Sequence, residues 1–298
     1  MRLDENRSRF SQRHPFLFGV LMIILAVVLV MGATAFFRSQ GVGGLGFGGD
    51  KLGVVNIEGT ILDSRDIVDW IYTLEKDDSI KGVLLRVNSP GGAIAPSQEI
   101  YAAVTELNRV KPVVASYGTV AASGGYYASV PARVIVANPG TLTASIGVVA
   151  EFVTVADALE KLGIKPEVLA TGRYKGAGTP LRNLTDEQRD QLLGLMQDMH
   201  EQFVSDVAKA RSLKRERVAA IADGRAVSGR QALALGLVDM LGGRLQAFDK
   251  LKQLCNITGK AVLVEGPTKE EPLLQKILGS IHIDLSASTP GSWSLYYK

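Results

Sequence analysis

The sequence has little of the side chains that metal and redox chemistry use. It contains one cysteine, Cys255, and three histidines among its 298 residues. A single cysteine excludes an intrachain disulfide and a cysteine-based zinc site, and its apolar helical surroundings predict a small buried hydrophobic residue. The metal-binding motif H-E-x-x-H is also missing, so zincin-type chemistry has no ligands. We expect neither a metal nor another cofactor.

The sequence also lacks a strong net charge of either sign. The formal net charge is +3, and charged residues make up 21% of the chain. Its basic residues are scattered, and a cluster such as K-R-E-R at residues 214–217 is typical of a solvated helix face. Because they do not gather with aromatic residues into a phosphate-tracking patch, nucleic acid is not an expected partner.

One long apolar run lies near the N-terminus. Residues 16–37 carry no charge and no polar stripe. A bilayer is spanned by ~20 residues, whereas the apolar part of a cleaved signal peptide has only ~7–15. We therefore expect a retained transmembrane helix in contact with the lipid bilayer. Four arginines precede it and only Arg38 closely follows, so residues 1–15 are expected in the cytoplasm and the rest outside the cytoplasmic (inner) membrane.

The remaining chain divides by composition. Residues 38–50 are glycine-rich and form a tether, residues 51–267 form one domain, and residues 268–298 form a tail, either a helix with an aromatic end or irregular chain. Within the domain, strands at 53–57, 82–88, 112–117 and 133–137 alternate with helices at 64–74, 96–110 and 121–130, with Ser64 as a cap. This alternation predicts parallel βαβ units and an α/β fold.

The alternation is expected to continue beyond residue 154. A helix at 156–162 and a strand at 166–170 lead to a long helix that Thr185 and Gln188 open as a capping box. Shorter helices are predicted at 214–222, 228–235 and 245–254, followed by a late strand at 260–265.

Four loops are candidates for chemistry, and Ser145 in T-A-S-I-G is the first. A serine nucleophile needs a base, and none of the histidines lies in a glycine-rich loop; His200 is expected to be a half-exposed helix residue. A desolvated lysine can replace histidine, because burial lowers its pKa. Lys175 in R-Y-K-G-A-G is the candidate, and a surface lysine in a mobile loop is the alternative.

Two glycine loops complete the set. N-S-P-G-G at residues 88–92 follows a buried strand, so its amides can form an oxyanion hole, although a plain strand-to-helix turn uses the same residues. A-A-S-G-G-Y-Y at 121–127 contains Ser123, which is a rival nucleophile.

These loops together resemble one known family. The ordered motifs R-V-N-S-P-G-G, A-A-S-G-G-Y-Y-A-S, A-N-P-G-T-L-T-A-S-I-G-V, G-R-Y-K-G-A-G-T-P-L-R-N-L-T-D-E-Q and D-G-R-A-V-S-G-R-Q-A-L-A-L-G-L-V-D look like the bacterial signal peptide peptidase A family in its short, single-repeat form. The likeness covers roughly residues 53–239. It implies a fold of the Clp-protease/crotonase type and catalysis by a Ser-Lys dyad.

The resemblance implies roles for individual residues. Ser145 becomes the nucleophile and Lys175 the base, with the oxyanion hole at Gly91 or Gly92. Ser123, together with Gly124, then supports the site, although the related Clp proteases use a serine in the comparable segment as nucleophile. One departure is Ala144, because the family usually has glycine before the nucleophile, which matters if that residue needs a positive φ.

The function implied is that of a membrane-anchored serine endopeptidase. Its substrates would be hydrophobic peptides, chiefly remnant signal peptides, and family members form ring-like homo-oligomers, so the dyad is expected either within or between subunits. Two alternatives stay open. One is a non-proteolytic crotonase-like enzyme acting on an acyl thioester, and the other is a membrane scaffold or a related protease acting on a stomatin-like partner.

Overall fold

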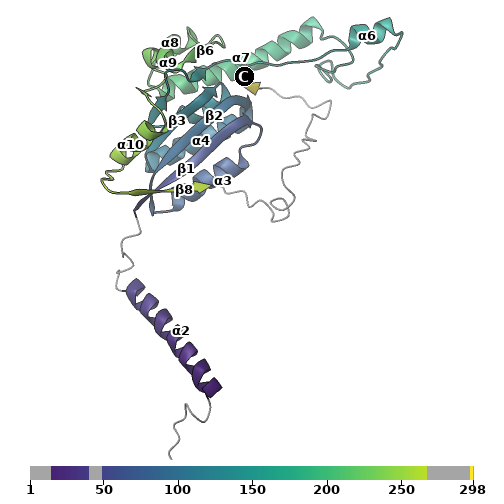
Figure 1. Cartoon of the computed structure of the whole chain (residues 1–298). Coiled ribbons are helices and arrows are strands. Elements are labelled where there is room, and N and C mark those ends of the chain that lie inside the picture. Colours follow the sequence, from purple (N-terminus) through teal and green to yellow (C-terminus); the bar gives the residue numbers. More distant parts are fainter. Residues whose placement is uncertain (1–14, 40–48, 267–295, 298) are drawn as a thin grey trace, which may run out of the picture. The chain divides into compact units, whose positions relative to one another are not determined.

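The structure is a computed structural model that describes residues 15–39, 49–266 and 296–297 (Figure 1). The chain divides into two compact units, Met1–Gly49 and Asp50–Lys298. In the first unit, α2 spans Pro15–Ser39. Among the helices of the described residues, none has the length and apolar character that crossing a membrane requires. The transmembrane segment therefore stays a prediction, and the helix expected in the tail lies outside the described residues.

One β-sheet organises the second unit, in the order β6-β5-β3-β2-β1-β8. The strands are β1 (Asp50–Ile61), β2 (Ile80–Ala93), β3 (Val113–Ala122), β4 (Val134–Ala137), β5 (Leu142–Ala144), β6 (Ala226–Ser228), β7 (Met240–Leu241), β8 (Ala261–Gly266) and β9 (Tyr296–Tyr297). All their pairings are parallel except those of β6 with β5 and of β9 with β2. The expected parallel sheet is confirmed, with two short antiparallel additions.

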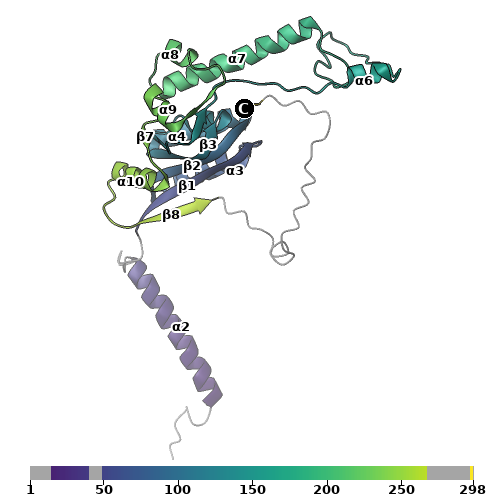
Figure 2. The ribbon, with the colours of Figure 1, turned by 45° about the horizontal axis from the view of Figure 1, so that its top comes forward.

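Helices cover both faces of this sheet (Figure 2). The larger core cluster includes residues of α3 (Arg65–Lys76), α4 (Ile94–Val110) and α5 (Gly124–Ser129), and the smaller one includes α10 (Arg244–Leu254). Side chains of β1 alternate between the two clusters, with Ile57 in the larger and Val54 in the smaller. Because both faces are buried, the strands read as continuous apolar runs.

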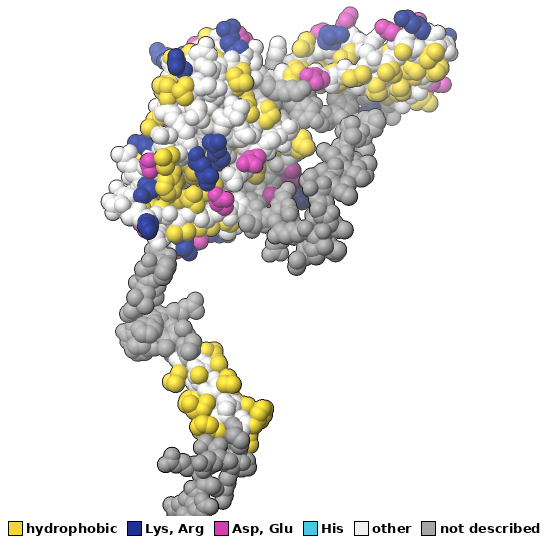
Figure 3. Space-filling model, viewed as in Figure 1, with side chains coloured by type: hydrophobic (Ala, Val, Ile, Leu, Met, Phe, Trp, Pro, Cys, Tyr) yellow, Lys and Arg dark blue, Asp and Glu magenta, His cyan; other side chains and the backbone are white. Residues whose placement is uncertain are grey.

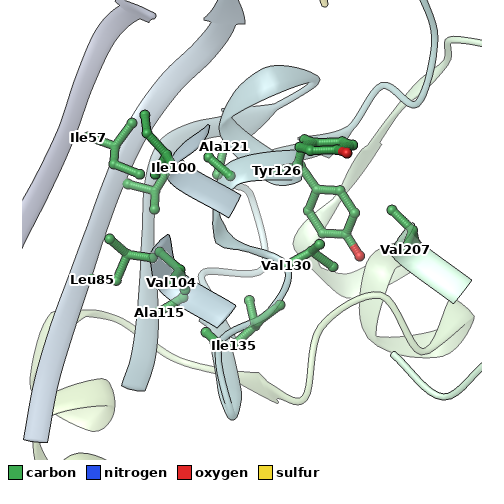
Figure 4. Packing of buried hydrophobic residues seen from close by; sticks show 14 of the residues in the cluster. Ile57, Leu85, Ile100, Val104, Ala115, Ala121, Tyr126, Val130, Ile135 and Val207 are labelled. Carbon is green, nitrogen blue, oxygen red and sulfur yellow. The ribbon is translucent and has the colours of Figure 1, made fainter. Parts of the chain in front are cut away.

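Tyr126 of α5 packs between the sheet and the segments that lie outside it. Figure 4 shows Ile57 and Leu85 facing α4, and Tyr126 lying near Val130 and Val207. The Tyr126 hydroxyl donates to the carbonyl of Leu237 at 2.9 Å, and burial raises its pKa well above the ordinary value. These contacts fix the position of α5, whose first residue follows Ser123.

The remaining helices are α6 (Ala156–Lys161), α7 (Asp186–Ala210), α8 (Arg215–Ala219) and α9 (Gly229–Leu235). The capping box before α7 is confirmed, with the Gln188 amide donating to Thr185 Oγ1 at 3.2 Å. We call residues 149–184 the arm. It carries α6, which lies at the outer end of α7, away from the sheet (Figures 1 and 2).

Three local predictions are wrong or only partly right. Residues 166–170 form no strand, because their side chains are exposed and no neighbouring strand pairs with them. Ser64 precedes α3 without capping it, since its hydroxyl donates to Glu99 of α4 instead. Cys255 is half-buried rather than buried, with its Sγ 3.3 Å from the carbonyl of Lys81.

Candidate active site

Ser145 lies in a strained turn directly after β5. Ala144 and Ser145 both have a positive φ, 61° and 52°. The turn is held on both sides, because Ala144 pairs with Ala122 of β3 and with Ala226 of β6. A left-handed backbone costs a residue with a side chain roughly 1–2 kcal/mol. Ala144 therefore occupies a position that glycine would adopt without this strain.

The loop at residues 223–225 braces this turn. Ser145 is 8% exposed, and its Oγ donates to the carbonyl of Gly224 at 3.1 Å. Its amide donates to the carbonyl of Arg225, and the Gly224 amide donates back to Ile146, both at 3.1 Å. The Arg225 guanidinium donates to the Asp223 carboxylate at 2.8 Å and lowers its pKa to about 2. The local sequence predicts a turn at Asp223-Gly224 but does not show that this loop contacts Ser145.

The glycine loop at the end of β2 is packed closely against β1. A Cβ on Gly92 would lie 2.1 Å from the carbonyl oxygen of Ile61, so only glycine fits there. Gly91 has a φ of 108°, and its amide donates to Ser89 Oγ at 3.1 Å. An oxyanion that binds the Gly91 amide must therefore displace the Ser89 hydroxyl from it.

Ser123 lies between the Ser145 turn and the glycine loop. It is fully buried at the junction of β3 and α5, with a φ of 52° and a ψ of −120°. Its amide donates to the carbonyl of Ala144 at 2.7 Å, and a Cβ on the adjacent Gly124 would lie 3.1 Å from the Gly92 nitrogen. Its Oγ has no hydrogen-bond partner among the described residues. A strained serine between strand and helix resembles a nucleophile elbow, but burial closes this one.

Lys175 lies in the arm, with an exposed side chain. Its amide donates to the carbonyl of Gly172 at 3.0 Å, and its carbonyl accepts from Arg182 at 3.4 Å. The hydrogen bonds found among residues 49–266 include none between Lys175 and Ser145. Their pairing remains a prediction.

His200 lies close to the turn that contains Ser145. The sequence shows only that it belongs to the middle of a helix. It is partly buried and lines a cavity of about 340 Å³ together with Gly147, Val148 and Gly224. Its Nε2 is buried without a hydrogen-bond partner among the described residues. Nothing in the local sequence could show this proximity, because it arises from the packing of α7 over the turn.

A second cavity adjoins the glycine loop. It has a volume of about 320 Å³ and is lined by Thr60, Leu62, Pro90, Gly91, Gly92, Val149 and Glu151. Its lining comes from β1, from the candidate oxyanion loop and from residues just after the Ser145 turn, so it is placed to take a side chain of a bound ligand. Over the part of the chain that is described, no cluster of three His, Cys, Asp or Glu residues could hold a metal ion.

Comparison with known proteins identifies the family to which this chain belongs. The family model of peptidase family S49 matches residues 105–258, which include Ser123, Ser145 and Lys175. The chain belongs to peptidase family S49. A second family model, that of Clp protease, matches residues 54–142. The chain is thus a serine-type peptidase with a mixed α/β, Clp-protease-like fold.

Three relatives illustrate the range of the family. A candidate protease of Synechocystis is 36% identical over 231 residues, covering 77% of this chain and 83% of the relative. A candidate protease of Methanocaldococcus jannaschii is 39% identical, covering 68% and 66%. A candidate signal peptide peptidase SppA of Enterococcus faecium is 34% identical, covering 67% and 58%. The S49 chain thus spans less than two thirds of the length of two of these relatives, 66% and 58%.

Proposed function

We propose that this S49 chain is a membrane-anchored serine endopeptidase that cleaves hydrophobic peptides, with Ser145 as nucleophile and Lys175 as general base. The observation that carries the proposal is the turn after β5. It holds Ser145 in a fixed, strained backbone that Ser123 and Gly124 connect to the glycine loop, as a preorganised nucleophile requires. Ser123 is the weaker candidate because it is fully buried.

The reaction is an acyl transfer in two halves. Neutral Lys175 takes the proton of Ser145 as Oγ attacks the peptide carbonyl, and an amide at Gly91 or Gly92 holds the oxyanion. The lysine ammonium then gives that proton to the leaving amine as the peptide C–N bond breaks. Water, activated by the same lysine, releases the acyl group and returns the proton to Ser145.

The base is proposed to come from a second copy of the chain. A lysine acts as a base near neutral pH only where burial lowers its pKa, and the Lys175 side chain is exposed in a single chain. The arm around it carries exposed apolar residues, including Val153 at 80% and Leu169 at 90%, and Figure 3 shows hydrophobic side chains gathered there. Apolar patches of this kind are typical of interaction surfaces. Docking of the arm on a homo-oligomer neighbour would desolvate the lysine.

The cavity beside the glycine loop supports the proposed substrate class. Leu62, Pro90 and Val149 give it an apolar lining next to the proposed oxyanion amides, which suits an apolar substrate side chain. Remnant signal peptides are apolar and membrane-borne. An anchor at residues 16–37, with the peptidase unit outside the cytoplasmic membrane, would keep the site where such peptides are released.

The test uses the full chain in detergent with a synthetic signal peptide. Ser145→Ala and Lys175→Ala should each abolish hydrolysis, whereas Lys161→Ala, which removes another exposed arm lysine, should leave it unchanged. If the base comes from a neighbour, mixing equal amounts of the two inactive variants should restore about a quarter of the wild-type rate. Half of the copies then keep Ser145, and half of the neighbours of these copies keep Lys175.

The mixing experiment separates the parts of the proposal. Inactive variants that stay inactive when mixed would place both residues in one copy. Substantial hydrolysis by the Lys175→Ala variant alone would remove Lys175 from the mechanism and would favour His200 or a crotonase-like acyl reaction.

A further inference from the structure

The loop that carries Lys175 is anchored to the first turn of α7. The Nε2 of Gln188 donates to the carbonyl of Arg173, two residues before Lys175, at 3.0 Å. A second contact comes from Arg182, whose guanidinium donates to the carbonyl of Lys175 itself at 3.4 Å. The backbone that carries the lysine is thus held at two points, although the lysine side chain is exposed.

Gln188 is buried in a part of α7 that is otherwise open to solvent. Its side chain belongs to a residue that is 4% exposed, whereas its neighbours Glu187 and Arg189 are exposed. Its Oε1 accepts from the Thr185 amide at 3.3 Å, which closes the capping box. Its Nε2 is therefore the group that remains for the loop. Because a buried amide without a partner costs about 1–3 kcal/mol, the bond to the Arg173 carbonyl keeps side chain and loop together.

The capping box of α9 shows that a cap alone does not require such a contact. There the Oε1 of Gln231 accepts from the Ser228 amide at 2.9 Å, in the same arrangement as in α7. The Gln231 side chain is exposed, however, and the hydrogen bonds found among residues 49–266 include none from its Nε2. The bond from Gln188 to the loop is therefore an addition to its role in starting the helix.

We propose that Gln188 is a positioning residue for Lys175, and that it fixes, through the carbonyl of Arg173, the backbone from which the lysine side chain extends. This inference rests on the function proposed above, in which Lys175 is the general base. The amine of a lysine lies at the end of a flexible four-carbon stem, so a mobile backbone would add to the volume that it samples. A displacement of about 1 Å in a reacting group can lower a rate about a hundredfold.

The anchor also connects the base to the core of the protein. Gln188 lies in α7, a helix of 25 residues, and the same helix contributes Phe203, Val204 and Val207 to the larger core cluster. The arm itself carries exposed apolar side chains. The position of Lys175 is thus tied to the core through a continuous helix, and not through the exposed arm alone.

The test exchanges one group of this side chain in the full-length protein. In Gln188→Glu the carboxylate still accepts from the Thr185 amide, but it has no hydrogen to donate to the Arg173 carbonyl. Gln231→Glu makes the same exchange in the capping box of α9 and is the matched control. With a synthetic signal peptide as substrate, Gln188→Glu should lower kcat about ten- to a hundredfold and leave KM within about twofold. Gln231→Glu should match the wild type in both.

Hydrogen exchange measures the anchor without turnover. The amides of Lys175 and Ala177 donate within the loop, to the carbonyls of Gly172 and Tyr174. Both should exchange faster in Gln188→Glu than in the wild type. They should exchange at the wild-type rate in the α9 control.

Two further measurements separate positioning from a purely structural role. The melting temperature of Gln188→Glu, and the fraction of chains that a fluorophosphonate finally labels, should match the wild type, while the rate of labelling falls. Gln188→Met and Gln231→Met repeat the comparison without introducing a charge at a buried position, and we expect the same contrast between them.

A wild-type kcat in both Gln188 variants would overturn the proposal. A fall in kcat without faster exchange in the loop would also overturn it, as would a loss of folded protein large enough to account for the lost activity. Failure of the proposed function gives a different result. Substantial hydrolysis by Lys175→Ala would remove the base from the mechanism and with it the catalytic part of this inference, whereas the exchange rates would still show whether Gln188 holds the loop.

Discussion

The sheet and the arm of this chain place their apolar side chains in opposite ways. In the sheet, Leu84 and Val114 are fully buried between two layers of helices, whereas Leu169 in the arm is 90% exposed. Packing against helices of the same chain thus stabilises the sheet. Within the described residues, no segment covers the exposed apolar side chains of the arm. Since the proposed nucleophile belongs to the sheet and the proposed base to the arm, we expect substitutions in the two regions to fail in different ways.

The largest effect is expected at the two strained serines, Ser123 and Ser145, which directly follow the sheet strands β3 and β5. Ser145→Ala should lower peptide hydrolysis by at least about a thousandfold, as loss of a nucleophile does. Ser123→Ala should lower it less than about tenfold, because the buried Ser123 hydroxyl supports the site without attacking the substrate. Labelling by a fluorophosphonate probe and thermal melting of both variants provide the measurement. Labelling that survives in Ser145→Ala but is lost in Ser123→Ala would reverse the two roles.

A smaller effect, of a different kind, is expected in the arm. Leu169→Glu should reduce hydrolysis about tenfold and shift the protein to smaller assemblies, because a charge at an apolar interface is poorly tolerated. Its melting temperature should change little, as for other exposed sites. Leu245→Glu, at a residue of α10 that is 65% exposed, is the matched control and should alter neither property. Analytical ultracentrifugation and peptide hydrolysis test this, and a large fall in melting temperature for Leu169→Glu would show that the arm packs within its own chain.

The smallest effect is expected at the residue before the nucleophile. Ala144→Gly should change the free energy of unfolding by less than about 1 kcal/mol, because relief of left-handed strain is offset by a more flexible backbone and a lost buried methyl. Ala144→Val should destabilise by about 2 kcal/mol, since a branched side chain is a backbone outlier there. Urea unfolding of both variants measures the difference. Equal stabilities would mean that the turn relaxes and that the sheet holds it less firmly than its pairing indicates.

The sequence was most informative where burial sets the pattern. The apolar runs of β1, β2 and β3 predict central strands because both of their faces are covered. The Thr185–Gln188 box predicts the start of α7 because capping uses neighbouring residues alone. Strand and helix alternation, which is a local signal, was therefore enough for the α/β class.

The sequence was least informative where distant segments decide. Residues 166–170 read as a strand by composition, but no neighbouring strand pairs with them in the described structure. The bracing of Ser145 by Gly224 and the proximity of His200 to the turn join segments that only the fold brings together. The family pattern has glycine where this chain has Ala144, which indicates that a positive φ matters there. The sequence alone could not show that Ala144 adopts one.

The tight contact at Gly92 links the shape of the apolar cavity to the position of the proposed oxyanion loop. A side chain there would meet the Ile61 backbone at 2.1 Å, so any replacement must push β1 away from β2. Thr60 and Leu62, on either side of Ile61, line the apolar cavity, and Gly92, a proposed oxyanion residue, lines it as well. The shape of the cavity and the position of the proposed oxyanion amide thus cannot be altered separately at Gly92. Changes in substrate preference are open instead to Val149 and Glu151, which line the cavity from outside the sheet.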